Sequence, residues 1–148
     1  MNRRDFVMLA ATTAVIAPKG SSGAEPIPVT LYKNPECSCC ESYAHYLGEN
    51  GFKVDERSTN DLAEISRKAG VPENLEGCHT SFIGDYVVGG HVPVPTIRKL
   101  LGQKPAIAGI TLPGMPPGSP GMGGEKTGSL IVYSVSGDSA PPRVFDVV

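Results

Sequence analysis

Residues 29–40, VTLYKNPECSCC, pass from a β-prone run through a turn into a cysteine-rich stretch. The run over residues 29–32 predicts a strand, and Asn34-Pro35 predicts the turn that ends it. The polar residues 38–50 that follow predict a helix, because their apolar side chains recur at helical spacing. The cysteines therefore lie where a strand hands over to the N-terminus of a helix.

The elements predicted after this junction alternate between strand and helix. A strand is expected over residues 52–57, a second helix capped by Asn60, a hairpin over 80–83 and 86–88, and a helix over 94–101. The order β-α-β-α-β-β-α predicts an α/β, thioredoxin-like fold, in which a βαβ half and a ββα half share one sheet.

The composition changes over residues 102–124, which contain seven glycines and five prolines together with Met115 and Met122. This Gly/Pro/Met-rich stretch predicts a loop throughout. Beyond it, residues 129–135 and 144–148 predict two C-terminal strands, either paired as a hairpin or added to a sheet edge.

The first residues have the pattern of a targeting segment. Arg3-Arg4 precedes the apolar run 6–17, and small residues follow up to Ala24. This pattern predicts a twin-arginine signal peptide over 1–24, which leaves residues 25–148 as a single thioredoxin-like domain. The apolar run is well short of the ~20 residues that span a bilayer, so we expect a periplasmic protein without a membrane segment after cleavage, an uncleaved anchor being the alternative.

Charge and composition argue against nucleic acid as a partner and leave the cysteines available for chemistry. The net charge is −2, tryptophan is absent, and no basic block is interleaved with aromatic residues, which argues against a nucleic-acid surface. A chain of this length can bury a core without disulfide staples, so its four cysteines are free for chemistry. In an oxidising compartment they would form disulfides unless a metal or a reductant holds them.

The cysteine cluster supports two kinds of chemistry. Cys37 and Cys40 have the C-x-x-C spacing of redox proteins, and the N-terminus of a helix stabilises thiolates. Cys39 adds a third thiol and Cys78 a fourth. A sulfur-rich site selects cuprous copper, zinc or an iron–sulfur cluster, and export together with the two loop methionines favours copper.

Cys78-His79 precedes the predicted hairpin, where a thioredoxin fold returns the chain to the N-terminus of the first helix. Thioredoxins hold a cis-proline at this position, so a cysteine there favours metal ligation over docking of a protein disulfide. Further candidate ligands are His79, His91, Met115 and Met122. His45 is expected on the surface of the first helix.

Three motifs together resemble a known family. They are NPECSCC at 34–40, GCHT at 77–80 and MPPGSPGM at 115–122. Through these motifs the chain resembles the CopG-type periplasmic copper-resistance proteins. This thioredoxin-like family is catalogued as a domain of unknown function. The resemblance implies Cu(I) held by Cys37, Cys39, Cys40 and Cys78 and a role in copper resistance. Residues 129–148 lie outside the best-matched region.

Alternative functions stay open. A thiol–disulfide or copper-redox oxidoreductase would use Cys37 as nucleophile and Cys40 as resolving thiol. A purely structural site would hold zinc or two disulfides. The expected partners are copper ions and other periplasmic copper-handling proteins, and the sequence leaves enzymatic activity undecided.

Overall fold

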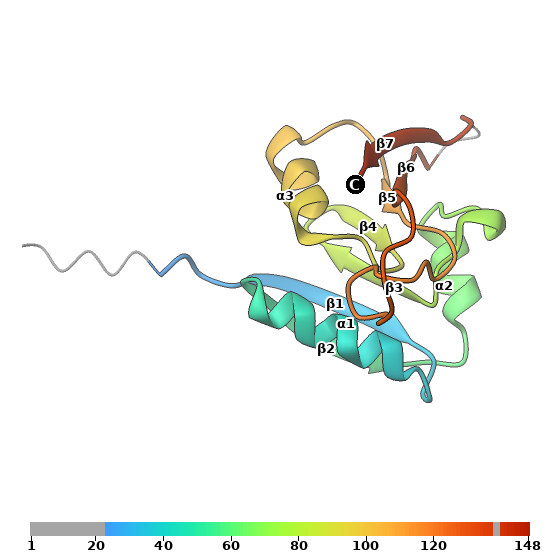
Figure 1. Ribbon diagram of the computed structural model, residues 1–148. Coiled ribbons are helices and arrows are strands. Elements are labelled where there is room, and N and C mark those ends of the chain that lie inside the picture. The colour runs from blue at the N-terminus through green and yellow to red at the C-terminus, as the bar shows by residue number, and fades with distance from the viewer. Residues whose placement is uncertain (1–22, 138–139) are drawn as a thin grey trace, which may run out of the picture.

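The computed structural model describes residues 23–137 and 140–148, so the predicted signal peptide over 1–24 lies almost entirely outside the described residues. Figure 1 shows helices packed around a β-sheet. The elements are β1 (Ile27–Lys33), α1 (Ser38–Glu49), β2 (Phe52–Ser58), α2 (Leu62–Lys68), a 3-10 turn (Glu73–Leu75), β3 (His79–Ile83), β4 (Tyr86–Gly89), α3 (Val94–Gln103), β5 (Gly109–Thr111), β6 (Ile131–Val135) and β7 (Arg143–Val147).

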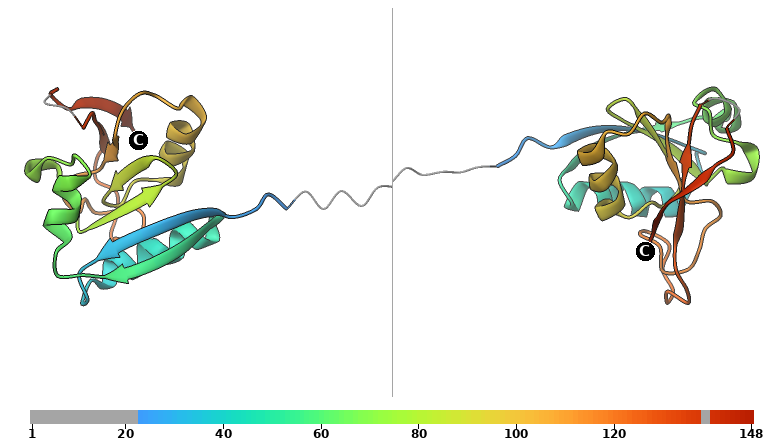
Figure 2. Two further views of the ribbon diagram at one scale, coloured as in Figure 1. Left: turned by 180° about the vertical axis from the view of Figure 1, so that it is seen from behind. Right: turned by 90° about the horizontal axis from the view of Figure 1, so that it is seen from above.

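The strands form one sheet in the order β2-β1-β3-β4-β5-β6-β7. β1 and β2 are parallel, while β3 pairs antiparallel with both β1 and β4. The first four strands with α1 and α3 therefore give the βαβ and ββα halves of a thioredoxin-like fold, and the predicted fold is confirmed. In Figure 2, β7 lies at the end of the sheet far from α1.

The core brings α1 and α3 against the same face of the sheet. Its fully buried side chains include Leu31 of β1, Tyr43 and Leu47 of α1, and Ile97 and Leu100 of α3. Side chains alternate across a strand, so residues 79, 81 and 83 of β3 share the face covered by α1. This packing fixes the start of β3 beside the N-terminus of α1.

α2 lies against the opposite face of β3. The hydroxyls of Ser66 and Thr80 form a buried hydrogen bond of 2.6 Å. The prediction that Asn60 caps this helix is wrong by one residue, because the cap is Asp61, whose N–H donates to the Thr59 hydroxyl at 3.0 Å. Within the described ranges, no helix is long and apolar enough to cross a membrane.

The prediction of a continuous loop over residues 102–124 is wrong at two places. Helix α3 extends to Gln103, and β5 forms a short strand parallel to β4. A side chain at Gly109 would overlap the backbone of Val87, so glycine here permits close approach of two strands. From composition alone, such a glycine is predicted to be a loop residue.

The C-terminal strands form both arrangements that the sequence left open. β6 and β7 pair antiparallel, and β5 joins this pair to the edge of β4. Asp146 of β7 accepts hydrogen bonds from Thr96 at 2.8 Å and Lys99 at 2.9 Å, which ties the extension to α3. The three added strands lengthen the sheet without entering the cysteine region.

Candidate metal centre

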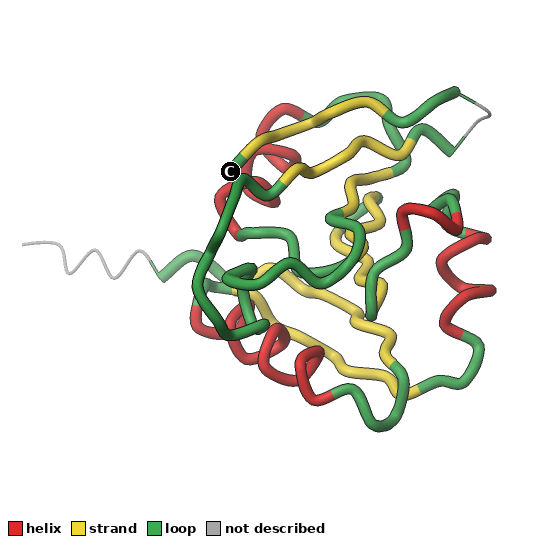
Figure 3. Tube along the Cα trace, turned by 45° about the vertical axis from the view of Figure 1, so that its right-hand side comes forward, coloured by secondary structure: helices red, strands yellow, loops and turns green. Residues whose placement is uncertain are grey.

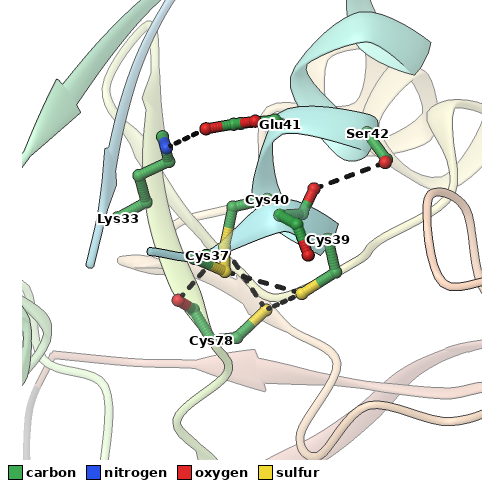
Figure 4. A network of polar contacts seen from close by, with 8 residues as sticks. Lys33, Cys37, Cys39, Cys40, Glu41, Ser42 and Cys78 are labelled. Carbon is green, nitrogen blue, oxygen red and sulfur yellow. Dashed lines mark hydrogen bonds and ion pairs between the residues drawn. A yellow bond between two sulfur atoms is a disulfide. The ribbon is translucent and has the colours of Figure 1, made fainter. Parts of the chain in front are cut away.

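Three cysteines surround the N-terminus of α1. Cys37 is the N-cap residue, and Cys39 and Cys40 lie in the first turn. Figure 4 shows their sulfurs grouped at this end of the helix. The free backbone N–H groups and the positive end of the helix dipole favour thiolates there.

Two of these cysteines are bonded to each other. Cys37 and Cys40 form a disulfide, while Cys39 and Cys78 are free thiols. The structure is therefore an oxidised form of the cluster, which differs from the four reduced thiols considered from the sequence. Addition of two electrons and two protons to this disulfide would yield four thiols.

Cys78 reaches the cluster from the other half of the fold. Its sulfur lies 3.7 Å from the sulfurs of both Cys39 and Cys40, and the Cys37 and Cys39 sulfurs are 3.5 Å apart. The four sulfurs all lie within 4.8 Å of one another. The structure thus brings together all four cysteines predicted as ligands.

A pair of glycines permits this approach. A side chain at Gly77 would place its Cβ only 2.5 Å from the Cα of Gly90, so the chain before β3 touches the turn after β4. Gly90 itself has a φ of 70°, a conformation that glycine adopts without strain. The contact sets Cys78 beside His91.

Both predicted histidine ligands lie next to Cys78, and both are fully buried. The Cys78 sulfur is 3.0 Å from Nε2 of His91 and 3.4 Å from Nδ1 of His79. Nδ1 of His91 lies 2.6 Å from the carbonyl oxygen of Pro120. Because a carbonyl only accepts, Nδ1 carries the proton, and neutral His91 presents a bare Nε2 to the Cys78 thiol.

Tyr43 is a residue of this centre that sequence reasoning missed. Its ring centroid lies 4.6 Å from that of His79 and 5.1 Å from that of His91, and its hydroxyl donates to the Val92 carbonyl at 2.7 Å. Helical spacing places Tyr43 on the apolar face of α1 but gives no sign of the imidazoles above it. The ring forms the floor beneath both histidines.

Burial keeps the side chains of Cys78, His79 and His91 uncharged. Desolvation, followed by the neighbouring Cys39, raises the pKa of Cys78 to about 12. Burial and the proximity of His91 lower the pKa of His79 to about 3, although a backbone hydrogen bond with Gly90 acts in the opposite direction. Burial also lowers the pKa of His91. At neutral pH the metal-free site offers a protonated thiol and two neutral imidazoles.

The two methionines predicted as ligands, and His45, are more exposed than the buried histidines. Met115 is 53% exposed, and Met122 is half-buried in a turn where its N–H donates to the Ser119 carbonyl at 3.0 Å. Ligation by either methionine stays a prediction. His45 lies on the surface as expected, 3.3 Å from Glu49, with a side chain 78% exposed.

The donor set fits a soft metal ion. Four sulfurs form one group, and Cys78, His79 and His91 form a second group whose donor atoms also lie within 4.8 Å of one another. In the described part of the chain, the buried Nε2 of His79 has no hydrogen-bond partner. Thiolate and imidazole donors suit Cu(I) or zinc and do not suit magnesium or calcium.

Comparison with known proteins gives a family model and two solved structures. The model described as "Protein of unknown function, DUF411" matches residues 75–122. Structures titled "Copper resistance protein copG", Forms 2 and 1, are each 33% identical to the chain, with a TM-score of 0.76. Each match covers 84% of this chain, and 99% and 98% of those chains. No curated protein matches the chain.

Proposed function

We propose that this chain, which belongs to the family of the copper resistance protein CopG, binds cuprous copper through Cys37, Cys39, Cys40 and Cys78 and contributes to copper resistance. The observation that carries the proposal is the convergence of four sulfurs, from two segments far apart in sequence, within 4.8 Å. Such a sulfur-rich group is the environment that Cu(I) prefers.

Copper is favoured over zinc by the relatives' titles and by the nature of the donors. Both matched structures are copper resistance proteins by title. Thioethers, which Met115 and Met122 offer, are acceptable donors for Cu(I) and poor ones for zinc. His91 is the best placed of the additional ligands, because its bare Nε2 lies 3.0 Å from the Cys78 sulfur.

Copper loading requires two chemical steps at the cysteines. A dithiol reductant opens the Cys37–Cys40 disulfide and is itself oxidised to a disulfide, which supplies the two electrons and two protons. Cu(I) then displaces the thiol protons, because the thiolate is the form that binds metal. The reduced protein is therefore the copper-binding form.

An anaerobic competition titration tests the proposal. Reduced protein is titrated into a coloured Cu(I)–chelator complex, and the absorbance of that complex should decrease as the protein withdraws copper. The protein with its disulfide intact is the control and should withdraw much less, since only Cys39 and Cys78 are free thiols in it. Failure of the reduced protein to compete would overturn the proposal.

We further propose that residues 1–24 direct export by the twin-arginine route and that residues 25–148 act in the periplasm, with copper ions and periplasmic copper-handling proteins as partners. Paired arginines before a short apolar run support this. Replacing Arg3 and Arg4 by lysine should retain the chain in the cytoplasm. Periplasmic protein that still begins at Met1 would contradict cleavage after Ala24.

The Cys37–Cys40 disulfide favours a second candidate function, thiol–disulfide or copper-redox oxidoreduction. In the thiol–disulfide case Cys37 attacks a substrate disulfide and Cys40 resolves the mixed disulfide. Metal-free protein supplied with a dithiol reductant, which regenerates the Cys37–Cys40 dithiol after each turnover, should then reduce insulin disulfides catalytically, and the activity should survive Cys78→Ser. Absence of turnover in the metal-free protein would eliminate the thiol–disulfide candidate.

A further inference from the structure

The glycine–proline loop, residues 112–130 between β5 and β6, has a fixed shape. Gly118 N–H donates to the Gly123 carbonyl at 3.1 Å, and Met122 N–H donates to the Ser119 carbonyl at 3.0 Å. The Ser119 hydroxyl, in a residue only 3% exposed, donates to the Pro116 carbonyl at 2.7 Å. These bonds make the middle of the loop a compact turn.

This turn is seated directly on α1. Figure 3 shows the loop extending from the sheet to that helix. A Cβ at Gly121 would lie 2.7 Å from the backbone nitrogen of Tyr43 and 2.9 Å from its Cα, distances that real Cβ atoms essentially never show. Gly121 also has a φ of 82°. Only glycine permits this backbone-to-backbone contact.

The residue before this contact reaches the metal centre. Pro120 presents its carbonyl oxygen to Nδ1 of His91 at 2.6 Å, and Nε2 on the other side of the same ring lies 3.0 Å from the Cys78 sulfur. A hydrogen bond to one ring nitrogen fixes both the orientation of an imidazole and which nitrogen is bare. The loop therefore contacts the centre through its backbone.

We propose that Gly121 and the backbone carbonyl of Pro120 are positioning residues of the metal centre. The contact of Gly121 with α1 holds the Pro120 carbonyl in place, and that carbonyl holds His91 with a bare Nε2 directed at Cys78. The inference rests on the proposed function in that it makes His91 and Cys78 copper ligands. It assigns the loop a role that does not depend on its methionines.

Two alanine variants separate positioning from general strain. Gly121→Ala adds the clash with Tyr43. Gly124→Ala is the matched control, because Gly124 has a φ of 80° and its added Cβ would meet only the Pro117 side chain at 3.5 Å, an ordinary contact. Both variants place an alanine at a positive φ near 80°, and only the first should lift the loop from α1.

The first readout needs no metal. Long-range ¹H–¹⁵N spectra of the metal-free protein should show His91 protonated at Nδ1 in the wild type and in Gly124→Ala. In Gly121→Ala this form should give way to a mixture of tautomers. A wild type with its proton on Nε2 of His91 would overturn the inference, even where a variant does not fold.

The second readout is Cu(I) affinity by chelator competition. Loss of a ligand-orienting hydrogen bond costs about 10–100-fold in metal affinity, so we expect about a tenfold loss in Gly121→Ala and a change within about twofold in Gly124→Ala. Equal affinities and tautomers in the two glycine variants would overturn the inference. Absence of copper binding in the wild type would instead overturn the proposed function.

Discussion

The α1 side of the metal centre takes Cys37, Cys39 and Cys40 from four consecutive residues, whereas the strand side gathers Cys78, His79 and His91 from the start of β3 and the turn after β4. The two sides also differ in burial. Cys37 and Cys39 are partly exposed, and both histidines are fully buried.

The difference in burial suggests different roles for the two sides: the α1 side is accessible from solvent, and the strand side is held rigidly. The α1 side can meet a reductant or an incoming ion, because Cys37 and Cys39 are partly exposed and the Cys37–Cys40 disulfide can be reduced. The strand side is held by packing on Tyr43 and by the hydrogen bond from His91 to the Pro120 carbonyl. We expect redox events to occur on the first side and orientation of ligands on the second.

The largest effect is expected where the two sides meet. Cys78 belongs to both groups of converging donor atoms, so Cys78→Ser should lower Cu(I) affinity by more than the roughly 10–100-fold cost of losing an orienting partner. Chelator competition under anaerobic conditions measures this. His45→Gln, at an exposed position, serves as the control and should not change the affinity. A Cys78→Ser protein with wild-type affinity would leave the α1 side as the whole binding site.

The next effect is on the strand side alone and concerns acid stability. The pKa of His79 is lowered to about 3, while an unfolded histidine titrates near 6.5. Below pH 6.5 the unfolded chain therefore binds more protons than the folded one. The free energy of unfolding should decrease as the pH is lowered, at a rate that approaches about 1.4 kcal/mol per pH unit for His79. The loss should end near pH 3, when folded His79 is protonated.

Urea denaturation between pH 7 and pH 5 measures this slope above the range where carboxylates titrate. His79→Gln should flatten it, leaving the contribution of His91, whose pKa is also lowered. A slope unaffected by His79→Gln would show that the buried imidazole is not the source of acid sensitivity.

The smallest effect is expected for the Tyr43 hydroxyl. Its removal tests whether this group stabilises the fold without contributing to copper binding. Tyr43→Phe keeps the ring beneath His79 but leaves the buried Val92 carbonyl without its hydroxyl donor. The free energy of unfolding should drop by about 1–3 kcal/mol, while Cu(I) affinity should fall by less than the roughly tenfold that loss of an orienting partner causes. Chemical denaturation and chelator competition measure the two quantities. Tenfold weaker copper binding at unchanged stability would assign the hydroxyl to the site itself.

The same contrast explains what the sequence could predict. Residues 37–40 are contiguous and lie at a strand–helix junction, so their role as a cluster is visible in the spacing alone. Cys78 was predictable through the fold, because a ββα half must return the chain to that helix. The order of helices and strands from β1 to α3 and the β3–β4 hairpin follow from the same periodic patterns and are confirmed.

Other parts depend on contacts that spacing does not encode. The contacts of the Tyr43 ring with both imidazoles, and the contact of the Pro120 carbonyl with His91, arise from packing between distant segments. β5 was hidden because Gly109 and its neighbours read as loop by composition, although Gly109 is needed where two strands approach closely. The disulfide state of Cys37 and Cys40 depends on redox conditions as well as on spacing.

The central claim is that copper is held by sulfur from both sides of the centre. X-ray absorption at the copper edge of the reduced, Cu(I)-loaded protein tests it most directly, with Cys78→Ser measured alongside. We predict a coordination shell dominated by sulfur in the wild type and a lower sulfur number in the variant. A shell of nitrogen or oxygen alone, or spectra identical in the two proteins, would contradict the claim.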